Sequence, residues 1–483
     1  MKSKISIISI LLLFYSNLFA ISTVSNYPVS MGTVLINTDF VIEFNSNIKL
    51  GVAGNIKIWH TSSNLTHSSY DVSDLSQTGV SANGMTLRIN HSPDLNLTSA
   101  YHVTIDNGAI QDLASTNWVG YSNSTEWNFT SGASGSNDRN ITGGHSHTLF
   151  LNDLRHLLGM GSNHAGQIGS VPLINLQQNV VDSNTTWRTV SSGEDFNLAL
   201  KIDGTLWAWG ENSKGQLGFG DFTQRNTPTQ VGSDTDWSSI SASGRSAFAL
   251  KADGTLWSWG HNSHGQLGVG TTSDLSVPTQ VGSQTTWTQI AAGINHTLGL
   301  QVDQTIYVWG SNGFGQLGTG EADNIVHSTP QSITGSWKQI AAGGFHSIGL
   351  TVNGEVKTWG KNTSGQLGVA GGNSPTLINA DTNWISIAAG TQHSLFLKAD
   401  GSLFGAGDNR HKQLTPTGTP IYNAQQIQAG YVWVSIYCGS FHSMATASDG
   451  LIHTWGNSNV GQTGSGQTND ISTPYNLNNV AVP

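Results

Sequence analysis

Residues 259–268 read Trp-Gly-His-Asn-Ser-His-Gly-Gln-Leu-Gly. Seven strong or weak copies of this pattern follow one another at steps of 47 to 50 residues, and their first glycines are Gly161, Gly210, Gly260, Gly310, Gly360, Gly407 and Gly456. A fixed period of this length is typical of stacked or radially arranged units, each too small to bury its own apolar face. The pattern therefore decides the architecture of the greater part of the chain.

One unit is clearest in residues 237–286. Short apolar runs predict four strands, at 237–240, 247–251, 255–260 and 278–281. Asp253-Gly254 is a two-residue hairpin signal between the second and third strands. Four short antiparallel strands per unit predict a β-propeller blade, and seven units predict a seven-bladed propeller.

The constant residues have structural explanations. The glycine after each tryptophan permits a positive φ and close backbone approach where blades converge. Tryptophans that open the units are expected to fill the gaps between sheets rather than to stack on sugars, which is the alternative; they are Trp187, Trp237, Trp287, Trp337, Trp384 and Trp433. No such tryptophan precedes Ile141, so ring closure must differ there. Asp303-Gln304 lacks the hairpin glycine and is expected to adopt another geometry, and Lys412 replaces a loop glycine.

The combined pattern of Trp-Gly-x-Asn-x-x-Gly-Gln-Leu-Gly and Ala-Ala-Gly-x-x-His-Ser-x-x-Leu resembles the regulator of chromosome condensation repeat. The resemblance covers about 141–483 and implies a seven-bladed propeller. It also implies guanine-nucleotide exchange on a small GTPase, the activity of nuclear members of that family.

The N-terminal part lacks the repeat. Lys2 and Lys4 precede an apolar run that ends in a small residue, which predicts a secretory signal peptide over 1–20. A retained membrane anchor is the alternative, but the apolar run is too short for a standard span. Alternating strands between 22 and 131 predict an Ig-like β-sandwich. The segments 97–105, 108–114 and 127–129 resemble a bacterial surface-layer-type Ig-like domain, and 132–140 form a polar linker.

Composition narrows the classes of function. The chain has a net charge of −10 with only 19 lysines and arginines, and it has no basic stripe, so a nucleic-acid partner is not expected. The single cysteine, Cys438, takes an alanine-like position and is expected to be a small buried hydrophobe. We expect a secreted, cell-surface or periplasmic bacterial protein, a monomer without a transmembrane segment once the signal is cleaved.

The sequence contains only weak candidates for catalytic or metal-binding motifs. Histidines recur after the Ala-Ala-Gly position, at His147, His296, His346, His393 and His442, and Phe196 and Ala247 are taken to replace them in the other two units. Each histidine belongs to a different blade, so a shared metal is not expected, and local backbone hydrogen bonds are the preferred explanation. No nucleophile elbow, phosphate loop or zinc motif is present, and no cofactor is expected.

The residues that vary within the constant frame are the candidate binding site. Pairs before the histidine position differ in every unit, as do residues before the loop glycine. In a propeller such loops surround one face, and aromatic residues with mixed charges are typical of recognition surfaces. The predicted partner-binding residues are Glu194, Asp195, Arg245, Asn295, Phe314, Phe345, Gln392 and Phe441. Relaxed loop drift without a partner is the alternative explanation.

Three functions remain open from the sequence. The first is an exported, non-catalytic binding or adhesion module for a protein or cell-surface macromolecule, including an inhibitor of a secreted enzyme. Nucleotide exchange is the second, and the signal peptide disfavours it. The third is an enzyme, for which Glu194 and Asp195 have no obvious catalytic partner.

Overall fold

The computed structural model describes residues 141–152, 155–169, 173–184 and 186–477, together with the backbone of ten short strands between residues 11 and 130. By contacts the chain divides into two compact units, Met1–Asp138 and Arg139–Pro483. In the described part of the chain, no helix is long and apolar enough to cross a membrane.

The first unit consists of antiparallel strands. Two four-stranded sheets have the orders β1-β2-β7-β6 and β10-β8-β4-β5, and β3 pairs with β9. The strands are β1 (Leu11–Leu12), β2 (Phe40–Glu43), β3 (Ile48–Leu50), β4 (Asn55–His60), β5 (Leu65–Asp71), β6 (Val80–Asn83), β7 (Thr86–Ile89), β8 (Ala100–Ile105), β9 (Ile110–Asp112) and β10 (Trp127–Thr130). The prediction of an N-terminal β-sandwich is confirmed. The linker 132–140 and all of the signal peptide except Leu11–Leu12 lie outside the described residues.

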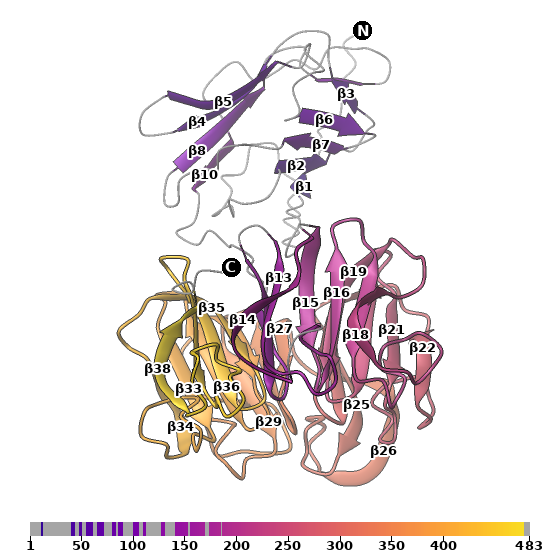
Figure 1. Cartoon of the computed structure of the whole chain (residues 1–483), viewed down its shortest axis with the longest axis vertical. Coiled ribbons are helices and arrows are strands. Elements are labelled where there is room, and N and C mark those ends of the chain that lie inside the picture. Colours follow the sequence, from indigo (N-terminus) through magenta and orange to yellow (C-terminus); the bar gives the residue numbers. More distant parts are fainter. Residues whose placement is uncertain are drawn as a thin grey trace. The chain divides into compact units, whose positions relative to one another are not determined.

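The second unit contains seven four-stranded antiparallel sheets, each formed by four consecutive strands (Figure 1). Blade 1 comprises β11 (Ile141–Gly143), β12 (His147–Leu151), β13 (Leu157–Ser162) and β14 (Ile174–Asp182). Blade 2 comprises β15 (Trp187–Ser192), β16 (Phe196–Lys201), β17 (Leu206–Gly210) and β18 (Arg225–Gln230). Blade 3 comprises β19 (Trp237–Ser243), β20 (Ser246–Lys251), β21 (Leu256–Gly260) and β22 (Leu275–Gln280). Blades 4 and 5 comprise β23 (Trp287–Ala292), β24 (His296–Gln301), β25 (Ile306–Asn312) and β26 (Asp323–Ile333); and β27 (Trp337–Ala342), β28 (His346–Thr351), β29 (Val356–Gly360) and β30 (Thr376–Leu377). Blades 6 and 7 comprise β31 (Trp384–Ala389), β32 (His393–Lys398), β33 (Leu403–Gly407) and β34 (Ile421–Gln426); and β35 (Trp433–Cys438), β36 (His442–Ala447), β37 (Ile452–Gly456) and β38 (Ile471–Asn476). This architecture confirms the predicted seven-bladed propeller.

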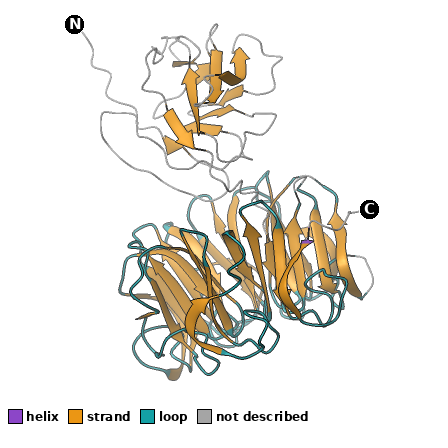
Figure 2. Cartoon of the chain, turned by 90° about the vertical axis from the view of Figure 1, so that its left-hand side faces the viewer, coloured by secondary structure: helices purple, strands orange, loops and turns teal. Residues whose placement is uncertain are grey.

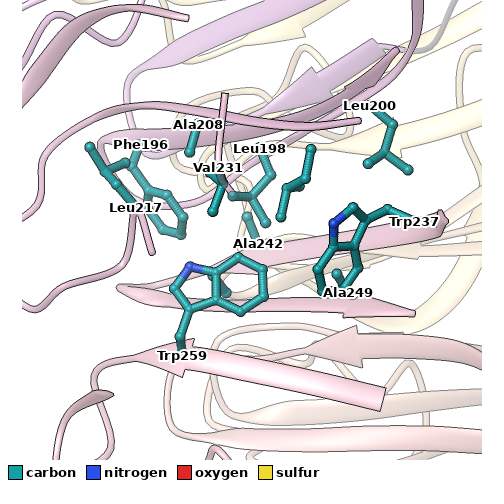
Figure 3. Packing of buried hydrophobic residues seen from close by; sticks show 12 residues of the cluster. Phe196, Leu198, Leu200, Ala208, Leu217, Val231, Trp237, Ala242, Ala249 and Trp259 are labelled. Carbon is teal, nitrogen blue, oxygen red and sulfur yellow. The ribbon is translucent and has the colours of Figure 1, made fainter. Parts of the chain in front are cut away.

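The apolar core lies between neighbouring blades. Trp237, which opens blade 3, packs with Trp259 of the same blade against Leu198, Leu217 and Val231 of blade 2 (Figure 3). All six opening tryptophans are buried. Their predicted role in filling the gaps between sheets is confirmed, because a buried indole is not available to stack on a sugar.

Ring closure uses a different core. Ile141 and Met160 of blade 1 pack with Met444, Ile452 and Leu477 of blade 7, and this cluster contains no tryptophan. Every strand of each blade comes from one continuous segment, so side-chain packing and interblade hydrogen bonds close the ring, rather than a strand borrowed from the other terminus.

Two positions that lack the expected glycine keep the glycine conformation. Gln304 has a φ of 70°, close to the 78° of Gly254, so the prediction of another hairpin geometry was wrong. Lys412 has a φ of 59°, against 75° at Gly215. The surrounding blade holds the turn, although a side chain in the left-handed region is strained.

Candidate interaction face around the central channel

The strand order of each blade places two kinds of loop at the same end of its strands. Figure 2 draws the loops in teal between the orange strands. The first joins the first and second strands and carries the variable pair; the second follows the third strand and carries the Gly-Gln pattern. A backbone hydrogen bond joins the two loops of each blade, as in Glu211 N–H to Asp195 O at 2.9 Å and Lys361 N–H to Phe345 O at 2.9 Å. We refer to this end as the loop face, and to the end with the Asp-Gly turns as the hairpin face.

Constant residues hold the second loop in one shape. The Gln216 Oε1 accepts a hydrogen bond from Lys214 N–H at 2.8 Å, and Asn212 Oδ1 accepts one from Leu217 N–H at 2.9 Å. The Gln216 carbonyl in turn accepts the Trp259 Nε1–H of the next blade at 2.9 Å. The asparagine, glutamine and tryptophan of the repeat are therefore scaffold, which leaves recognition to the residues between them.

The central channel opens in the middle of the loop face. A cavity of about 310 Å³ is lined by small residues of the first strands and by the first members of the variable pairs, including His145, Glu194 and Ile294. Cys438 also lines it. This residue takes the alanine-like position predicted for it and packs against the core between blades 6 and 7, although it is half-buried rather than fully buried. Burial raises the pKa of the Cys438 thiol, so the thiol is protonated at neutral pH.

The five repeated histidines bond across blades rather than to local backbone, which corrects the sequence interpretation. His346 Nε2 lies 2.9 Å from Ser394 Oγ of the next blade, and His296, His393, His147 and His442 make the equivalent contacts with Ser347, Ser443, Asn197 and Thr148. Burial lowers the pKa of His346 to about 3, so the rings are neutral. Among the described residues, no group of three or more histidine, cysteine, aspartate or glutamate side chains could hold a metal ion.

The register of blade 3 also corrects the prediction. Ser246 pairs with Gly260, just as His296 pairs with Gly310, so Ser246 and not Ala247 occupies the histidine position. The variable pair of this blade is consequently Gly244-Arg245. Arg245 was predicted as the first member of its pair, equivalent to Ile294; the structure makes it the second member, equivalent to Asn295.

A charged cluster lies on blades 2 and 3. Arg245 Nε lies 3.0 Å from Glu194 Oε2 and 3.5 Å from Glu211 Oε2. Asp195 Oδ1 accepts a hydrogen bond from Gln167 Nε2 at 3.1 Å, and burial raises the pKa of Asp195. Glu194 is thus held by the Arg245 guanidinium and Asp195 by the Gln167 amide.

Aromatic residues occupy two other parts of the loop face. Phe314 and Phe345 meet edge to face at 5.6 Å between ring centroids, with Lys361 Nζ at 4.9 and 5.3 Å from them. Phe441 lies between His145 and His411, at 5.5 and 5.8 Å. Cation–π and edge contacts of this kind pre-order the side chains.

The structure places all eight predicted residues on the loop face. Seven of them are half-buried, and Phe314 is 43% exposed. Gln392 accepts a hydrogen bond from Ser364 Oγ at 2.9 Å. Asn295 belongs to the same face, and its carbonyl accepts a hydrogen bond from Ser311 N–H at 2.8 Å.

Sequence reasoning missed Glu211, Lys361 and His411, which contact the predicted residues directly. Glu211 and Lys361 directly follow the glycine of the Trp-Gly pair. The residue after this glycine also differs from blade to blade, and its N–H donates to the carbonyl of the second variable residue. Its variation could therefore have identified it as part of the loop face.

Comparisons with known proteins agree with this architecture. A family model described as the RCC1-like domain matches residues 121–380, and models of the regulator of chromosome condensation (RCC1) repeat match 384–413 and 433–462. A bacterial Ig-like domain model matches 20–131. Because the first model matches more than half of the chain, the protein belongs to the RCC1-like domain family, whose propellers are typically binding or regulatory structures.

Individual relatives share part of the propeller. The chain is 31% identical over 112 residues to the probable E3 ubiquitin-protein ligase HERC6 of Homo sapiens, covering 21% of this chain and 10% of that protein. It is 31% identical over 96 residues to the X-linked retinitis pigmentosa GTPase regulator of Canis lupus familiaris, covering 18% and 9%. The matches thus span a tenth or less of these relatives.

Solved structures show the same fold. Prp20p from Saccharomyces cerevisiae, described with its binding to Gsp1p and histones, aligns with a TM-score of 0.61 at 22% identity, over 66% of this chain and 85% of that one. Human WBSCR16 aligns with a TM-score of 0.59 at 21% identity, over 68% and 91%.

Proposed function

We propose that this protein is an exported, non-catalytic binding module whose loop face holds a protein partner. The observation that carries the proposal is that constant and variable residues have separate roles within each loop. Constant asparagine, glutamine and tryptophan residues fix the loop backbone. The residues that differ from blade to blade surround the channel opening on one face.

The variable residues also contact one another between blades, which unconstrained drift would not require. Arg245 of blade 3 bonds to Glu194 of blade 2, and Phe345 of blade 5 packs on Phe314 of blade 4. Pre-ordered aromatic and arginine side chains bind with a smaller loss of conformational entropy. These contacts favour a recognition surface over relaxed loops.

The test is a paired-variant capture experiment. Phe314→Ala with Phe441→Ala should abolish recovery of the partner from the native cell envelope or neighbouring cells, with little change in the unfolding temperature. The matched control is Ile202→Ala with Val302→Ala, since these apolar side chains of the hairpin turns are 52% and 68% exposed. Equal recovery by the loop-face variant and the wild type would remove the proposed face.

Export is part of this proposal and has its own test. The basic start, apolar run and Ala20 of the N-terminal segment support cleavage by a signal peptidase. N-terminal sequencing of the protein from its native host should begin at Ile21. A cytoplasmic protein that retains Met1–Ala20 would contradict export.

Nucleotide exchange on a small GTPase is the second candidate. It is favoured by the 31% identity to a GTPase regulator over 96 residues. Purified protein should then accelerate nucleotide release from at least one GTPase of a panel. No acceleration across the panel would remove this candidate.

A further inference from the structure

The loop face carries different charged groups on different blades. Blades 2 and 3 contribute Glu194 and Glu211 around one guanidinium, that of Arg245. Blade 5 contributes Lys361, whose ammonium lies over the rings of Phe314 and Phe345. We refer to Phe314, Phe345 and Lys361 as the aromatic-lysine patch.

Lys361 lacks the counter-ion that several other cations of the loop face have. Lys214, Arg245 and Arg410 each lie within 3.1 Å of a carboxylate oxygen. No ion pair is formed by Lys361 within the part of the chain that the structure describes; its ammonium contacts the two phenylalanine rings. An ammonium already positioned over aromatic rings can accept a carboxylate without a large loss of side-chain entropy.

The repeated loop glutamines of blades 4 and 5 also lack hydrogen-bond acceptors for their side-chain amides. The Gln216 Nε2 donates to Glu211 at 3.2 Å, and Gln167 Nε2 donates to Asp195 at 3.1 Å. In blades 4 and 5, Gln316 Nε2 and Gln366 Nε2 are buried without a hydrogen-bond partner. Uncompensated N–H groups add positive partial charge beneath the patch, where burial weakens screening.

The patch also offers apolar area for a partner's side chain. Phe314 is 43% exposed. An ammonium beside an exposed aromatic ring complements a carboxylate next to an apolar side chain.

We propose that the aromatic-lysine patch docks a protein segment that carries an aspartate or glutamate beside an apolar residue. The carboxylate pairs with Lys361, and the apolar side chain packs on Phe314. This inference rests on the proposed function and names the chemistry of the partner segment. The chain's net charge of −10 does not oppose it, because screening confines charge effects to roughly 8–10 Å at physiological salt.

The test uses a random peptide library displayed on phage and selected on the full-length protein. Enriched peptides should carry Asp or Glu next to a leucine, isoleucine or aromatic residue. Their affinity should fall by about tenfold in Lys361→Gln, fall further in Lys361→Glu, and largely persist in Lys361→Arg. Raising the salt concentration should weaken binding to the wild type more than binding to Lys361→Gln.

Other results separate this inference from the proposed function. Peptides that lose binding in Arg245→Gln but not in Lys361→Glu would overturn the patch and leave the loop face standing. Peptides without acidic residues that bind Lys361→Glu normally but fail on Phe441→Ala would do the same. If selection yields no binder, or only binders insensitive to every loop-face substitution, both proposals fail.

Discussion

His346 Nε2 lies 2.9 Å from Ser394 Oγ, which belongs to the next blade. The Ser394 hydroxyl donates its single hydrogen to the Gln366 carbonyl at 2.7 Å. The serine oxygen must therefore accept from histidine, so the ring carries its proton on Nε2. His346 Nδ1 is buried without a hydrogen-bond partner. The repeated histidine is thus an interblade connection, and burial keeps its ring neutral.

This connection predicts acid sensitivity. Burial lowers the pKa of His296, His346 and His442 to about 3, and that of His147 and His393 to about 4. In the unfolded chain the histidines have pKa values near 6.5 and bind protons below that pH, whereas the buried rings of the folded chain do not. The histidine contribution to the free energy of unfolding is therefore fully present above about pH 6.5 and falls as the pH decreases toward 4. Each histidine contributes a slope of about 1.4 kcal/mol per pH unit.

Thermal unfolding followed as a function of pH checks this prediction. The unfolding temperature should be level near neutrality and decrease steadily below about pH 6.5. Hydrogen bonds from Thr255 lower the pKa of Asp253, so its contribution to folding stability is lost only at pH values more acidic than those at which the histidines act. An unfolding temperature unchanged down to about pH 4.5 would contradict the neutral-histidine account.

A second prediction concerns the exception to this connection. Phe196 occupies the histidine position of blade 2, and Ala247 occupies the facing serine position of blade 3. Both polar partners are therefore replaced together. In a double-mutant cycle, Ser394→Ala alone should leave the His346 Nε2–H buried and unpaired, at a cost of about 1–3 kcal/mol.

Adding His346→Phe to Ser394→Ala should recover part of this loss. We expect a coupling free energy of about 1 kcal/mol or more from chemical denaturation of the single and double variants. The coupling should be absent for Ser246→Phe with Thr297→Ala, whose side chains bond separately to the His261 and Gln266 carbonyls. Additive effects in the first pair would show that the contact contributes no net stability.

The sequence predicted the fold because each blade repeats the same spacing. Opening tryptophans, hairpin turns and Gly-Gln loops recur often enough to reveal the unit, and all eight candidate residues lie on one face. The errors arose where a local deviation hid the register. In blade 3, Ser243 replaces the glycine and Gly244 follows it, so that the histidine position was assigned to Ala247 in place of Ser246.

The remaining features depend on contacts between units, which spacing within one unit does not reveal. The serine that bonds to His296, His346 or His393 is 48 to 51 residues away in the sequence. The interblade role of Lys361 is likewise visible only where blade 5 meets Phe314 of blade 4. The seam is formed by Met160 and Leu477 at opposite ends of the repeat array, so its core was also hidden from the sequence.

A third prediction concerns the strained turn at Gln304. Its φ of 70° places a side chain in the left-handed region that Gly254 occupies at 78°. In blade 3, Thr285 lies next to the turn residue Gly254. The equivalent neighbour of Gln304 is Gly335, which has no side chain, and the turn therefore tolerates a glutamine. Gln304→Gly should stabilise the fold by up to about 1 kcal/mol through relief of this strain.

The reciprocal change is the control for Gln304. An added Cβ at Gly254 would lie 2.1 Å from the Thr285 carbonyl oxygen, so Gly254→Ala should be clearly destabilising. Chemical denaturation measures both variants. A destabilised Gln304→Gly protein would mean that the glutamine side chain contributes more than its backbone strain costs.

Hydrogen–deuterium exchange of the full-length protein, alone and with its captured partner, tests the central claim most directly. The account predicts slower exchange on binding in the loop-face segments 193–196, 311–316, 343–346 and 439–442, and no change in the hairpin turns at 202–205 and 302–305. Protection confined to the hairpin turns or to the outer strands, with the loop face unchanged, would contradict the account.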